Sequence, residues 1–466
     1  MASWAFFLWV GHLETPEPRP TPYLKGSVMS FHTAVLFPGQ GAYLPGVLAD
    51  RASRLPRAAE ALDAIDEVVT AQGHDPIAPL LLDREAPSLQ DLLKSDSDRL
   101  DLAIYATNAV AAELLAGMGV RGDVLMGHSF GEFAALSAAG AVSVTDVARM
   151  ACARIDAFRG AAPEDGGLVA LDVPAWRADH LVGVLDEPGL RTAIDNGPSQ
   201  TVVSGPSASL ERVEKVAMDL GLRATRLRAR YAFHNPLLSD AADRFRTAVA
   251  DVTVGAPRVA VFSPVLGRFV HSAADVREVV ERNMIAPVPF YEALLTLFRQ
   301  GTRVFIEAGA RQALTGIVRS SLPAAATAIP LLANRGDMEG LAATLTSAGV
   351  PARWRAGDDR GADTANDGPL DDHVHVPSPT GDGATDGRAD LLAQLTAFYA
   401  EDLGFPAEML TADIDLEADL GVDSAKQIAL FERVRSHYDL PVVPGERRNE
   451  ATTLERIADL VEELRG

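Results

Sequence analysis

The sequence predicts a large α/β domain followed by a small, all-α domain, and three observations support this division. From Ala34 to about Arg335, short apolar runs alternate with longer amphipathic stretches, the pattern of strands and helices in one α/β domain. Residues 357–389 are rich in Asp, Gly, Pro, Thr and Ala, with 8 acidic and 2 basic residues. About 77 residues of strongly helical pattern then follow.

The α/β domain is expected to span residues 31–350, with its first strand within residues 30–37. Residues 1–28 contain a Pro-rich stretch and an apolar run, Trp4–Val10, that is too short to cross a bilayer. We therefore expect residues 1–28 to be a disordered extension or the result of a start codon assigned too early.

A small subdomain is expected at about residues 165–230, because strand and helix patterns alternate there in the order βαββαβ. Its four strands are predicted at the following residues: 168–173, 190–194, 201–204 and 224–227.

The C-terminal part divides into a flexible acidic linker over residues 357–388 and a helical domain over residues 389–466. The linker has almost no large apolar side chains, so burial cannot offset the entropy cost of ordering it. From Asp390 to Gly466 there are 17 Asp and Glu against 7 Lys and Arg, which makes the helical domain a candidate for electrostatic docking.

Charge and cysteine content exclude several classes of function. A net charge of −22 argues against a nucleic-acid surface, which needs clustered Lys and Arg. Cys152, the single cysteine, cannot form an intramolecular disulfide and is predicted to be a core residue. No metal-binding spacing and no transmembrane span are found in the sequence, and a cytoplasmic location is expected.

The strongest local motif is Gly127-His-Ser-Phe-Gly131, which follows an apolar strand and precedes a helix of small residues. Glycines in such a strand-to-helix turn relieve crowding, so that Ser129 projects outward at the N-terminus of the helix. Unpaired amides and the helix dipole favour an oxyanion there. Ser129 is thus a candidate nucleophile, although Gly and Ser are also common in ordinary loops.

A serine hydroxyl needs a base, because an alcohol is a poor nucleophile at neutral pH. His234 is the best candidate of the 10 histidines, since an apolar run breaks into a Pro-containing turn beside it.

Four motifs together resemble the malonyl-CoA:acyl carrier protein acyltransferases in order and spacing. They are Phe37-Pro-Gly-Gln-Gly41, Gly127-His-Ser-Phe-Gly-Glu132, Asn196-Gly-Pro-Ser-Gln-Thr-Val-Val-Ser-Gly205 and Tyr231-Ala-Phe-His234. The resemblance covers about 300 residues and implies an α/β-hydrolase-like large subdomain with an inserted ferredoxin-like small subdomain.

The resemblance implies a Ser129–His234 pair that works without a catalytic Asp, with a backbone carbonyl orienting the imidazole. We expect the stretch Glu307–Gln312 to supply that carbonyl. The backbone amides of Gln40 and Phe130 match the positions of the oxyanion hole.

Arg154 resembles the family residue that pairs with the free carboxylate of a malonyl-type acyl group, and a planar guanidinium suits a carboxylate. The resemblance also implies that His128, Gln200, Tyr231 and Phe233 bind substrate. Tyr231-Ala-Phe-His234 is a hybrid of the patterns that accompany malonyl and methylmalonyl in the family. Because Phe233 should crowd an α-substituent, malonyl is favoured, with methylmalonyl as the alternative.

The helical domain resembles acyl carrier proteins, in which an Asp-Ser pair at the start of a helix receives 4′-phosphopantetheine. Here the pair is Asp423-Ser424, which implies Ser424 as the attachment site, although Ser424 can also be read as a simple helix cap. The residues expected on one apolar face after it are Ala425, Ile428, Leu430, Phe431, Val434 and Tyr438. A four-helix carrier domain is expected.

The predicted activity is transfer of a malonyl-type unit from coenzyme A to a carrier thiol in polyketide or fatty-acid biosynthesis. The expected partners are an acyl-CoA, the chain's own carrier domain and other carriers, a ketosynthase and a phosphopantetheinyl transferase. Two further hypotheses are an editing hydrolase that uses water as acceptor and a non-catalytic carrier and docking module.

Overall fold

The computed structural model describes residues 31–354, apart from 50, 52, 53, 164 and 334–337, and parts of the C-terminal segment. The C-terminal residues described are 387–403, 416, 430, 431, 433–435, 438, 440 and 453–465. The predicted extension at 1–28, most of the predicted linker and Ser424 lie outside the described residues. Residues 387 and 388, predicted as the end of the linker, belong to helix α14 instead.

A six-stranded sheet forms the centre of the large subdomain, in the order β11-β10-β1-β2-β7-β8. Its first five strands are parallel and β8 is antiparallel to β7. The strands are β1 (Thr33–Phe37), β2 (Val124–Gly127), β7 (Ala260–Ser263), β8 (Arg268–Val270), β10 (Val304–Ala310) and β11 (Thr327–Leu332). Strands β1, β2 and β10 are buried along their whole length, as expected for parallel strands covered on both faces, and β10 buries Glu307 among its apolar residues.

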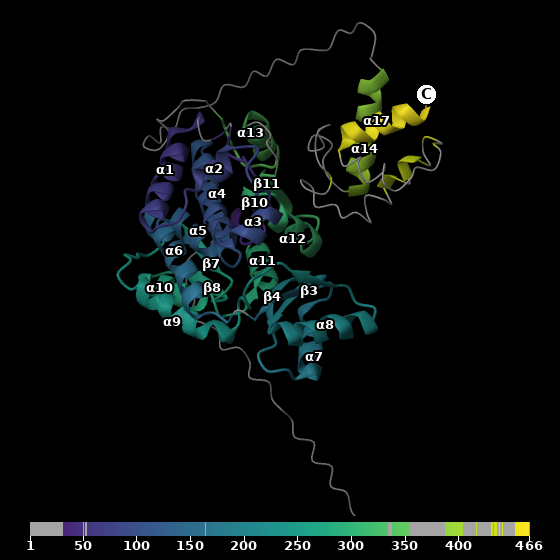
Figure 1. Ribbon diagram of the computed structural model, residues 1–466. Helices are drawn as coiled ribbons and strands as arrows, with labels where there is room; N and C mark the ends of the chain where they lie inside the picture. The colour runs from purple at the N-terminus through teal and green to yellow at the C-terminus, as the bar shows by residue number, and fades with distance from the viewer. Residues whose placement is uncertain are drawn as a thin grey trace, which may run out of the picture.

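Helices cover this sheet (Figure 1). Before the small subdomain they are α1 (Pro56–Ala71), α2 (Ala78–Leu82), α3 (Leu89–Ser95), α4 (Ser97–Gly117), α5 (Gly131–Ala138) and α6 (Val144–Ala161). After it come η2 (Pro236–Leu238), α9 (Ser239–Ala248), α10 (Ala273–Arg282), α11 (Phe290–Arg299), α12 (Ala313–Ser321) and α13 (Met338–Ser347). Helix α6 starts where Ser143 Oγ accepts a hydrogen bond from the Asp146 amide at 3.0 Å, an N-cap that fixes the register of Arg154 on this helix.

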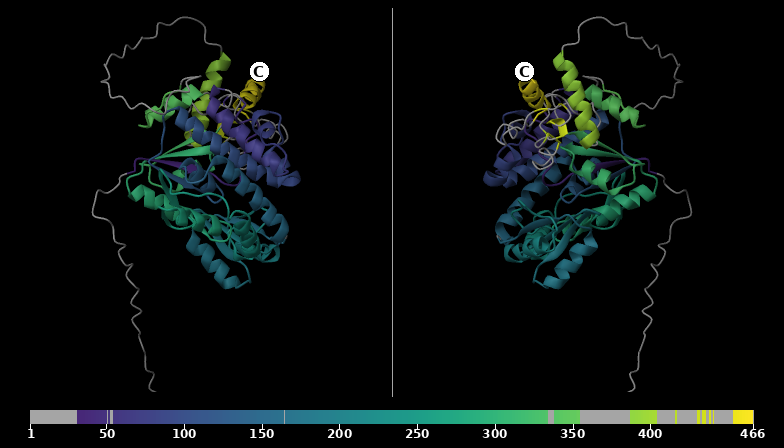
Figure 2. Two further views of the ribbon diagram at one scale, coloured as in Figure 1. Left: turned by 90° about the vertical axis from the view of Figure 1, so that its left-hand side faces the viewer. Right: turned by 90° about the vertical axis from the view of Figure 1, so that its right-hand side faces the viewer.

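The small subdomain contains the βαββαβ order that the sequence predicts. Its elements are β3 (Gly167–Leu171), α7 (Ala175–Leu185), β4 (Arg191–Gly197), β5 (Gln200–Gly205), α8 (Ser207–Asp219) and β6 (Ala224–Leu227). The strand order is β6-β3-β5-β4-β9, and the added strand β9 (Val288–Pro289) pairs in parallel with β4. In Figures 1 and 2 its helices lie at the far end of the molecule from α1.

The two faces of the small sheet serve different purposes, because successive side chains of a strand point to opposite sides. On β3, Val169 and Leu171 pack into a core with α7 and α8. Leu168 and Ala170 face the other way and line a cavity that Ser129 also lines. The small subdomain therefore forms one wall of that cavity.

The described part of the C-terminal segment has its own apolar core. Helices α14 (Gly387–Leu403) and α17 (Leu454–Arg465) pack together in it. Of the predicted apolar face, Leu430, Phe431 and Val434 are buried in this core and Tyr438 packs against it. Part of the predicted four-helix domain lies outside the described residues.

Helix α4 is the one described helix with the length and hydropathy of a membrane span, and 78% of its most apolar window is buried inside the fold. Among the described residues, no group of three or more His, Cys, Asp or Glu side chains is placed to hold a metal ion. Cys152 is buried, as predicted.

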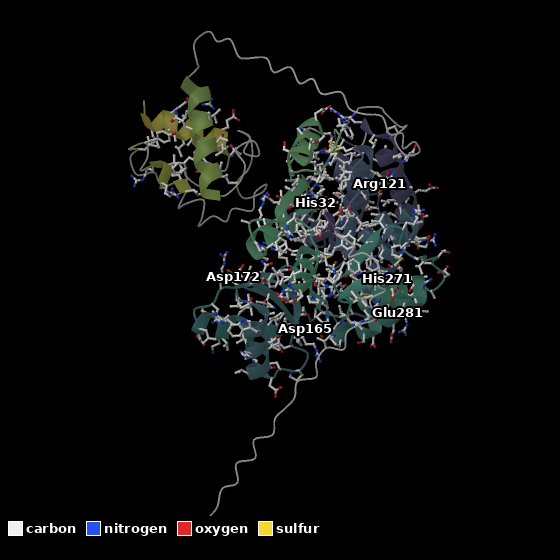
Figure 3. The ribbon with its side chains drawn as sticks, turned by 180° about the vertical axis from the view of Figure 1, so that it is seen from behind. His32, Arg121, Asp165, Asp172, His271 and Glu281 are labelled. Atoms are coloured by element: carbon white, nitrogen blue, oxygen red, sulfur yellow. The ribbon has the colours of Figure 1, made fainter. Side chains whose placement is uncertain are left out.

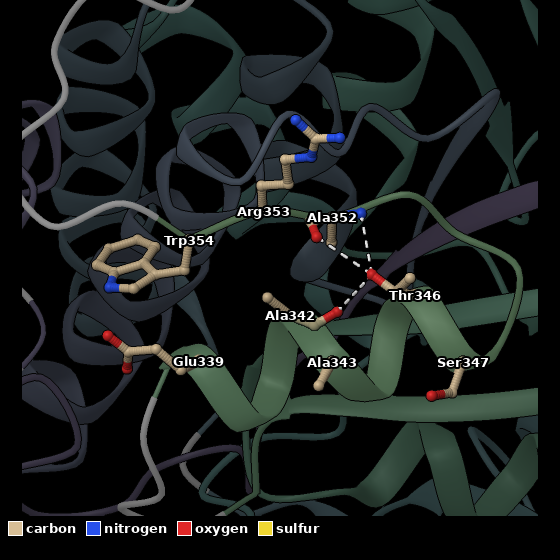
Figure 4. Close-up of a pocket in the computed structure, with 8 residues that line it drawn as sticks. All are labelled: Glu339, Ala342, Ala343, Thr346, Ser347, Ala352, Arg353 and Trp354. Carbon is tan, nitrogen blue, oxygen red and sulfur yellow. Dashed lines mark hydrogen bonds between the residues drawn. The ribbon is translucent and has the colours of Figure 1, made fainter. Parts of the chain in front are cut away.

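A separate hollow of about 540 Å³ lies between α13 and residues 352–354 (Figure 4). Thr346, which lines it, connects the two sides: its hydroxyl donates to the Ala342 carbonyl at 2.8 Å and accepts from the Ala352 amide at 3.3 Å. None of the residues that line this hollow lines the cavity at Ser129.

Candidate active site

Ser129 stands in the turn between β2 and α5, as the motif predicts. Its φ of 54° is a left-handed conformation that few non-glycine residues adopt. The flanking glycines are required by close approach: a Cβ on Gly127 would collide with the backbone of Glu132, and one on Gly131 with the Phe37 carbonyl. The turn therefore packs too tightly against its own helix and β1 for any side chain at these two positions.

His234 is brought directly to Ser129, 105 residues apart in the chain, with 2.6 Å between Ser129 Oγ and His234 Nε2. His234 Nδ1 lies 3.0 Å from the Ala286 carbonyl oxygen. A carbonyl only accepts, so Nδ1 carries the proton and Nε2 presents its lone pair to the serine hydroxyl. The expectation that Glu307–Gln312 supplies this carbonyl is wrong, because the carbonyl comes from the segment after α10.

Burial, and secondarily the neighbouring His128, lower the pKa of His234 to about 3. The side chain is almost completely buried, which disfavours the imidazolium form. His234 is therefore neutral near pH 7 and able to accept a proton.

The segment 283–286 holds both residues of the pair, and sequence reasoning missed it. Asn283 Nδ2 donates to the Ser129 carbonyl at 2.9 Å, and the Met284 carbonyl accepts from the His234 amide at 2.9 Å. Together with the Ala286 carbonyl, this single segment fixes the position of Ser129 and of His234. In the sequence, Asn283 looks like an ordinary polar residue at the end of an amphipathic helix.

The loop after β1 packs against the serine turn. A Cβ on Gly39 would lie 2.8 Å from the His128 carbonyl, so this glycine allows the loop to approach. Gln40 and Phe130 both line the cavity beside Ser129. Within the described residues, neither backbone amide donates a hydrogen bond, which leaves both free for an oxyanion.

A cavity of about 1010 Å³ opens over Ser129. Seven of the eight other predicted site residues of this domain line it: Gln40, His128, Phe130, Arg154, Gln200, Phe233 and His234. The exception is Tyr231, which does not line the cavity and stacks on Phe158 with ring centroids 5.0 Å apart. Asp172, labelled in Figure 3 on the small subdomain, also lines the cavity.

A chain of amide hydrogen bonds connects the serine turn to the small sheet. His128 Nε2 lies 2.8 Å from Asn196 Oδ1, and Asn196 Nδ2 donates to Gln200 Oε1 at 2.7 Å. Asn196 and Gln200 belong to β4 and β5, so this chain positions one wall of the cavity relative to Ser129.

Arg154 lies at the cavity with its side chain only 4% exposed, whereas Arg149 and Arg159 on the same helix are 46% and 49% exposed. Its Nη1 donates to Asp101 Oδ2 at 3.1 Å. The other oxygen of Asp101 accepts from Gln40 Nε2 at 3.1 Å. Asp101 was missed at the sequence level, where the only signal is one acidic residue within the apolar run of α4.

Glu132 braces the serine turn from behind. It is buried and accepts hydrogen bonds from Ser263 Oγ at 3.1 Å and the Val265 amide at 3.0 Å. Burial raises the pKa of Glu132 to about 8, so the protonated form is favoured at neutral pH.

Two family descriptions match this chain. Residues 35–350 match the family described as acyl transferase domain, and residues 393–461 match the phosphopantetheine attachment site.

Curated relatives include polyketide synthase GfsA of Streptomyces halstedii, 30% identical over 332 residues, which cover 70% of this chain and 4% of that protein. The spectinabilin polyketide synthase system protein NorB of Streptomyces orinoci is 30% identical over 353 residues, covering 72% of this chain and 16% of that protein. The chain thus spans only a small part of these relatives.

Solved structures with the same fold include the acyltransferase domain from module 8 of the salinomycin polyketide synthase. Its TM-score is 0.62 at 28% identity, covering 69% of this chain and 76% of that one. An acyl-carrier-protein S-malonyltransferase from Burkholderia pseudomallei has a TM-score of 0.58 at 25% identity, covering 65% of this chain and 96% of that one. The chain belongs to the acyl transferase domain family and carries a C-terminal phosphopantetheine attachment site.

Proposed function

We propose that this protein transfers an acyl group from an acyl-CoA to a carrier thiol through an acyl-Ser129 intermediate. The contact of 2.6 Å between Ser129 Oγ and neutral His234 Nε2 carries the proposal. The strand orders of the two sheets support the assignment of an α/β-hydrolase-like large subdomain and a ferredoxin-like small subdomain.

In the first half-reaction, His234 Nε2 takes the hydroxyl proton as Ser129 Oγ attacks the thioester carbonyl. The oxygen of that carbonyl gains negative charge, which the Gln40 and Phe130 amides stabilise. When the carbon–sulfur bond breaks, the coenzyme A thiolate takes the proton from His234 and leaves an ester on Ser129. The Ala286 carbonyl keeps the imidazole oriented and favours the imidazolium formed during the step.

In the second half-reaction the same groups act in reverse. Phosphopantetheine supplies the acceptor thiol, and Ser424 is the proposed attachment residue, which lies outside the described residues. His234 removes the thiol proton, the new thioester forms, and Ser129 recovers its proton. The acidic linker of about 30 residues gives the chain's own carrier a high effective concentration at Ser129.

We propose a malonyl-type unit as the acyl group that Arg154 recognises, with His128, Gln200 and Phe233 as further substrate contacts. Support comes from the place of Arg154 at the cavity and from relatives such as the S-malonyltransferase. The ring of Phe233 has its centroid 5.5 Å from the Arg154 guanidinium carbon, which leaves less room for an α-substituent and favours malonyl over methylmalonyl. We place Tyr231 behind this site, where it supports Phe158.

The proposed partners follow from the two half-reactions. A phosphopantetheinyl transferase must prepare the carrier, and a ketosynthase consumes the loaded unit. Polyketide synthases among the relatives support this setting.

The test is intact-protein mass spectrometry of the holo protein with malonyl-CoA, comparing the wild type with Ser129→Ala and Ser424→Ala. We expect acylation at both serine sites in the wild type, at Ser129 only in Ser424→Ala, and at neither in Ser129→Ala. Persistent loading of the carrier in purified Ser129→Ala protein would refute the acyl-enzyme. Free malonate released faster than carrier loading would favour an editing hydrolase.

Mixing the two variants separates loading within a chain from loading between chains. Ser129→Ala protein has an intact carrier, and Ser424→Ala protein has an intact active site. Carrier loading in the mixture at a rate that rises with concentration would show that transfer between chains occurs.

A further inference from the structure

The guanidinium proposed to read the substrate already holds a carboxylate of its own chain. Arg154 comes from α6 and Asp101 from α4, and their side chains are 4% and 8% exposed. Gln40 donates to the second oxygen of Asp101, so both oxygens of this carboxylate are engaged. Asp101 is therefore held in place by two partners.

The pair is placed so that Arg154 faces the substrate and Asp101 lies behind it. Arg154 lines the cavity, whereas Asp101 does not. Arg154 Nε has no hydrogen-bond partner among the described residues. The guanidinium thus retains donor capacity, but its charge is neutralised by Asp101.

Three aromatic rings surround the same guanidinium. Its carbon lies 4.8 Å from the ring centroid of Phe130, 4.6 Å from that of Phe158 and 5.5 Å from that of Phe233. Two of these rings, Phe130 and Phe233, line the cavity. An acyl chain that reaches Arg154 therefore meets apolar faces as well as a cation.

Binding a second carboxylate beside Arg154 is energetically unfavourable. An acyl group with a free carboxylate would bring two negative charges to one buried guanidinium, where water screens their repulsion poorly. An uncharged acyl chain brings no charge and leaves the Asp101–Arg154 pair intact. Breaking a buried pair is costly, because it leaves an uncompensated charge.

We propose that Asp101 is a specificity-determining residue that competes with the substrate carboxylate for Arg154, so that the enzyme transfers uncharged acyl chains alongside malonyl-type units. The inference rests on the proposed acyl transfer through Ser129. It assigns to the same site a second substrate class, the CoA thioesters of simple monocarboxylic acids.

The test compares kcat/KM for Ser129 acylation by malonyl-CoA and by butyryl-CoA, measured on the full holo protein by rapid quench and mass spectrometry. For the wild type we expect a malonyl-to-butyryl ratio below about 10. Asp101→Asn keeps the shape and removes the charge, so the ratio should rise at least about 10-fold, the size of one charge-assisted hydrogen bond. The gain should come from a lower KM for malonyl-CoA.

Asp101→Glu keeps the negative charge that Asp101→Asn removes. Its malonyl-to-butyryl ratio should therefore stay in the wild-type range, which a merely structural role would not predict. A wild-type ratio above 10, or a ratio in folded Asp101→Asn protein that rises less than 10-fold, would overturn the inference. If Asp101→Asn does not fold, the wild-type ratio and the Asp101→Glu ratio decide. Failure of the proposed function gives a different result, since then neither thioester labels Ser129.

Discussion

Replacing Asn283 by Ala tests whether the segment after α10 holds the Ser129–His234 pair in place. Asn283 is fully buried, and its Nδ2 donates to the carbonyl of Ser129, a residue with the unfavourable φ of 54°. The same carbonyl also accepts from the Glu132 amide at 3.1 Å, so it loses one of the two donors it has among the described residues.

The magnitude has two parts. Loss of a buried hydrogen bond costs about 1 kcal/mol, and the space left by the amide adds about 1 kcal/mol more. A left-handed non-glycine residue stores on the order of 1 kcal/mol of strain, so a turn with fewer restraints relaxes and moves Ser129 Oγ away from His234 Nε2. We expect Ser129 acylation to slow about 10-fold, which corresponds to about 1.4 kcal/mol in the barrier.

The assay is the rate of Ser129 acylation by rapid quench and mass spectrometry, together with the midpoint of thermal unfolding. The midpoint should fall by roughly 2 °C for each kcal/mol lost in a domain of this size. Asn283→Asp keeps the shape but cannot donate when ionised, and it should be at least as slow as Asn283→Ala. Arg282→Ala is the matched control, because Arg282 is 48% exposed and its pair with Glu278 lies on the surface.

An Asn283→Ala protein that acylates within twofold of the wild type would refute this reasoning. So would an equal slowing in Arg282→Ala, because the effect would then belong to the end of the helix and not to the contact with Ser129.

Four further outcomes follow from the geometry of the site. Gly131→Ala places a Cβ against the Phe37 carbonyl and should lower stability by about 1–3 kcal/mol or more, measured as loss of folded protein on thermal melting. Because the folded pKa of His234 is lowered to about 3, the acylation rate should stay within twofold between pH 5 and 8, and a midpoint near pH 6.5 would contradict this. The lowered pKa of His234 also makes the folding stability of the protein depend on pH: this contribution is complete above pH 6.5 and is lost as the pH falls toward 3. Acid unfolding of the wild type and of His234→Phe, compared over this range, measures the loss. Because the pKa of Glu132 is raised to about 8 in the folded protein, its contribution to folding stability is present below pH 4.5 and is lost as the pH rises through 8. Glu132→Gln should therefore flatten the alkaline side of the plot of stability against pH.

The parts of the site that the sequence could predict are local ones. Ser129 was predictable because a strand, a glycine-bounded turn and a helix are contiguous, and their geometry follows from short-range sterics. The strands of the small sheet were predictable within about three residues at each end, because their alternation reflects one buried face and one that lines the cavity. Strand β9 was not, since a two-residue strand has no period to detect.

The parts that escaped prediction are contacts between distant elements. The carbonyl that orients His234 lies 52 residues away at Ala286, and any residue has a carbonyl, so no side chain marks it. Asp101 lies 53 residues before Arg154, and only the packing of α4 against α6 brings the two together. A buried acidic residue in an apolar helix is a detectable signal, but its partner is set by the fold.

The segment after α10 explains why the Ser129–His234 pair and the small subdomain are positioned together. Its carbonyls and the Asn283 side chain hold His234 and Ser129, and the chain then continues directly into β9. Strand β9 pairs with β4, whose Asn196 binds His128, the neighbour of Ser129. The serine turn is thus connected to the small sheet in two ways, through His128 and Asn196 and through the segment 283–286 and β9. Because one face of that sheet is a wall of the cavity at Ser129, a shift of this wall also displaces Ser129 and His234.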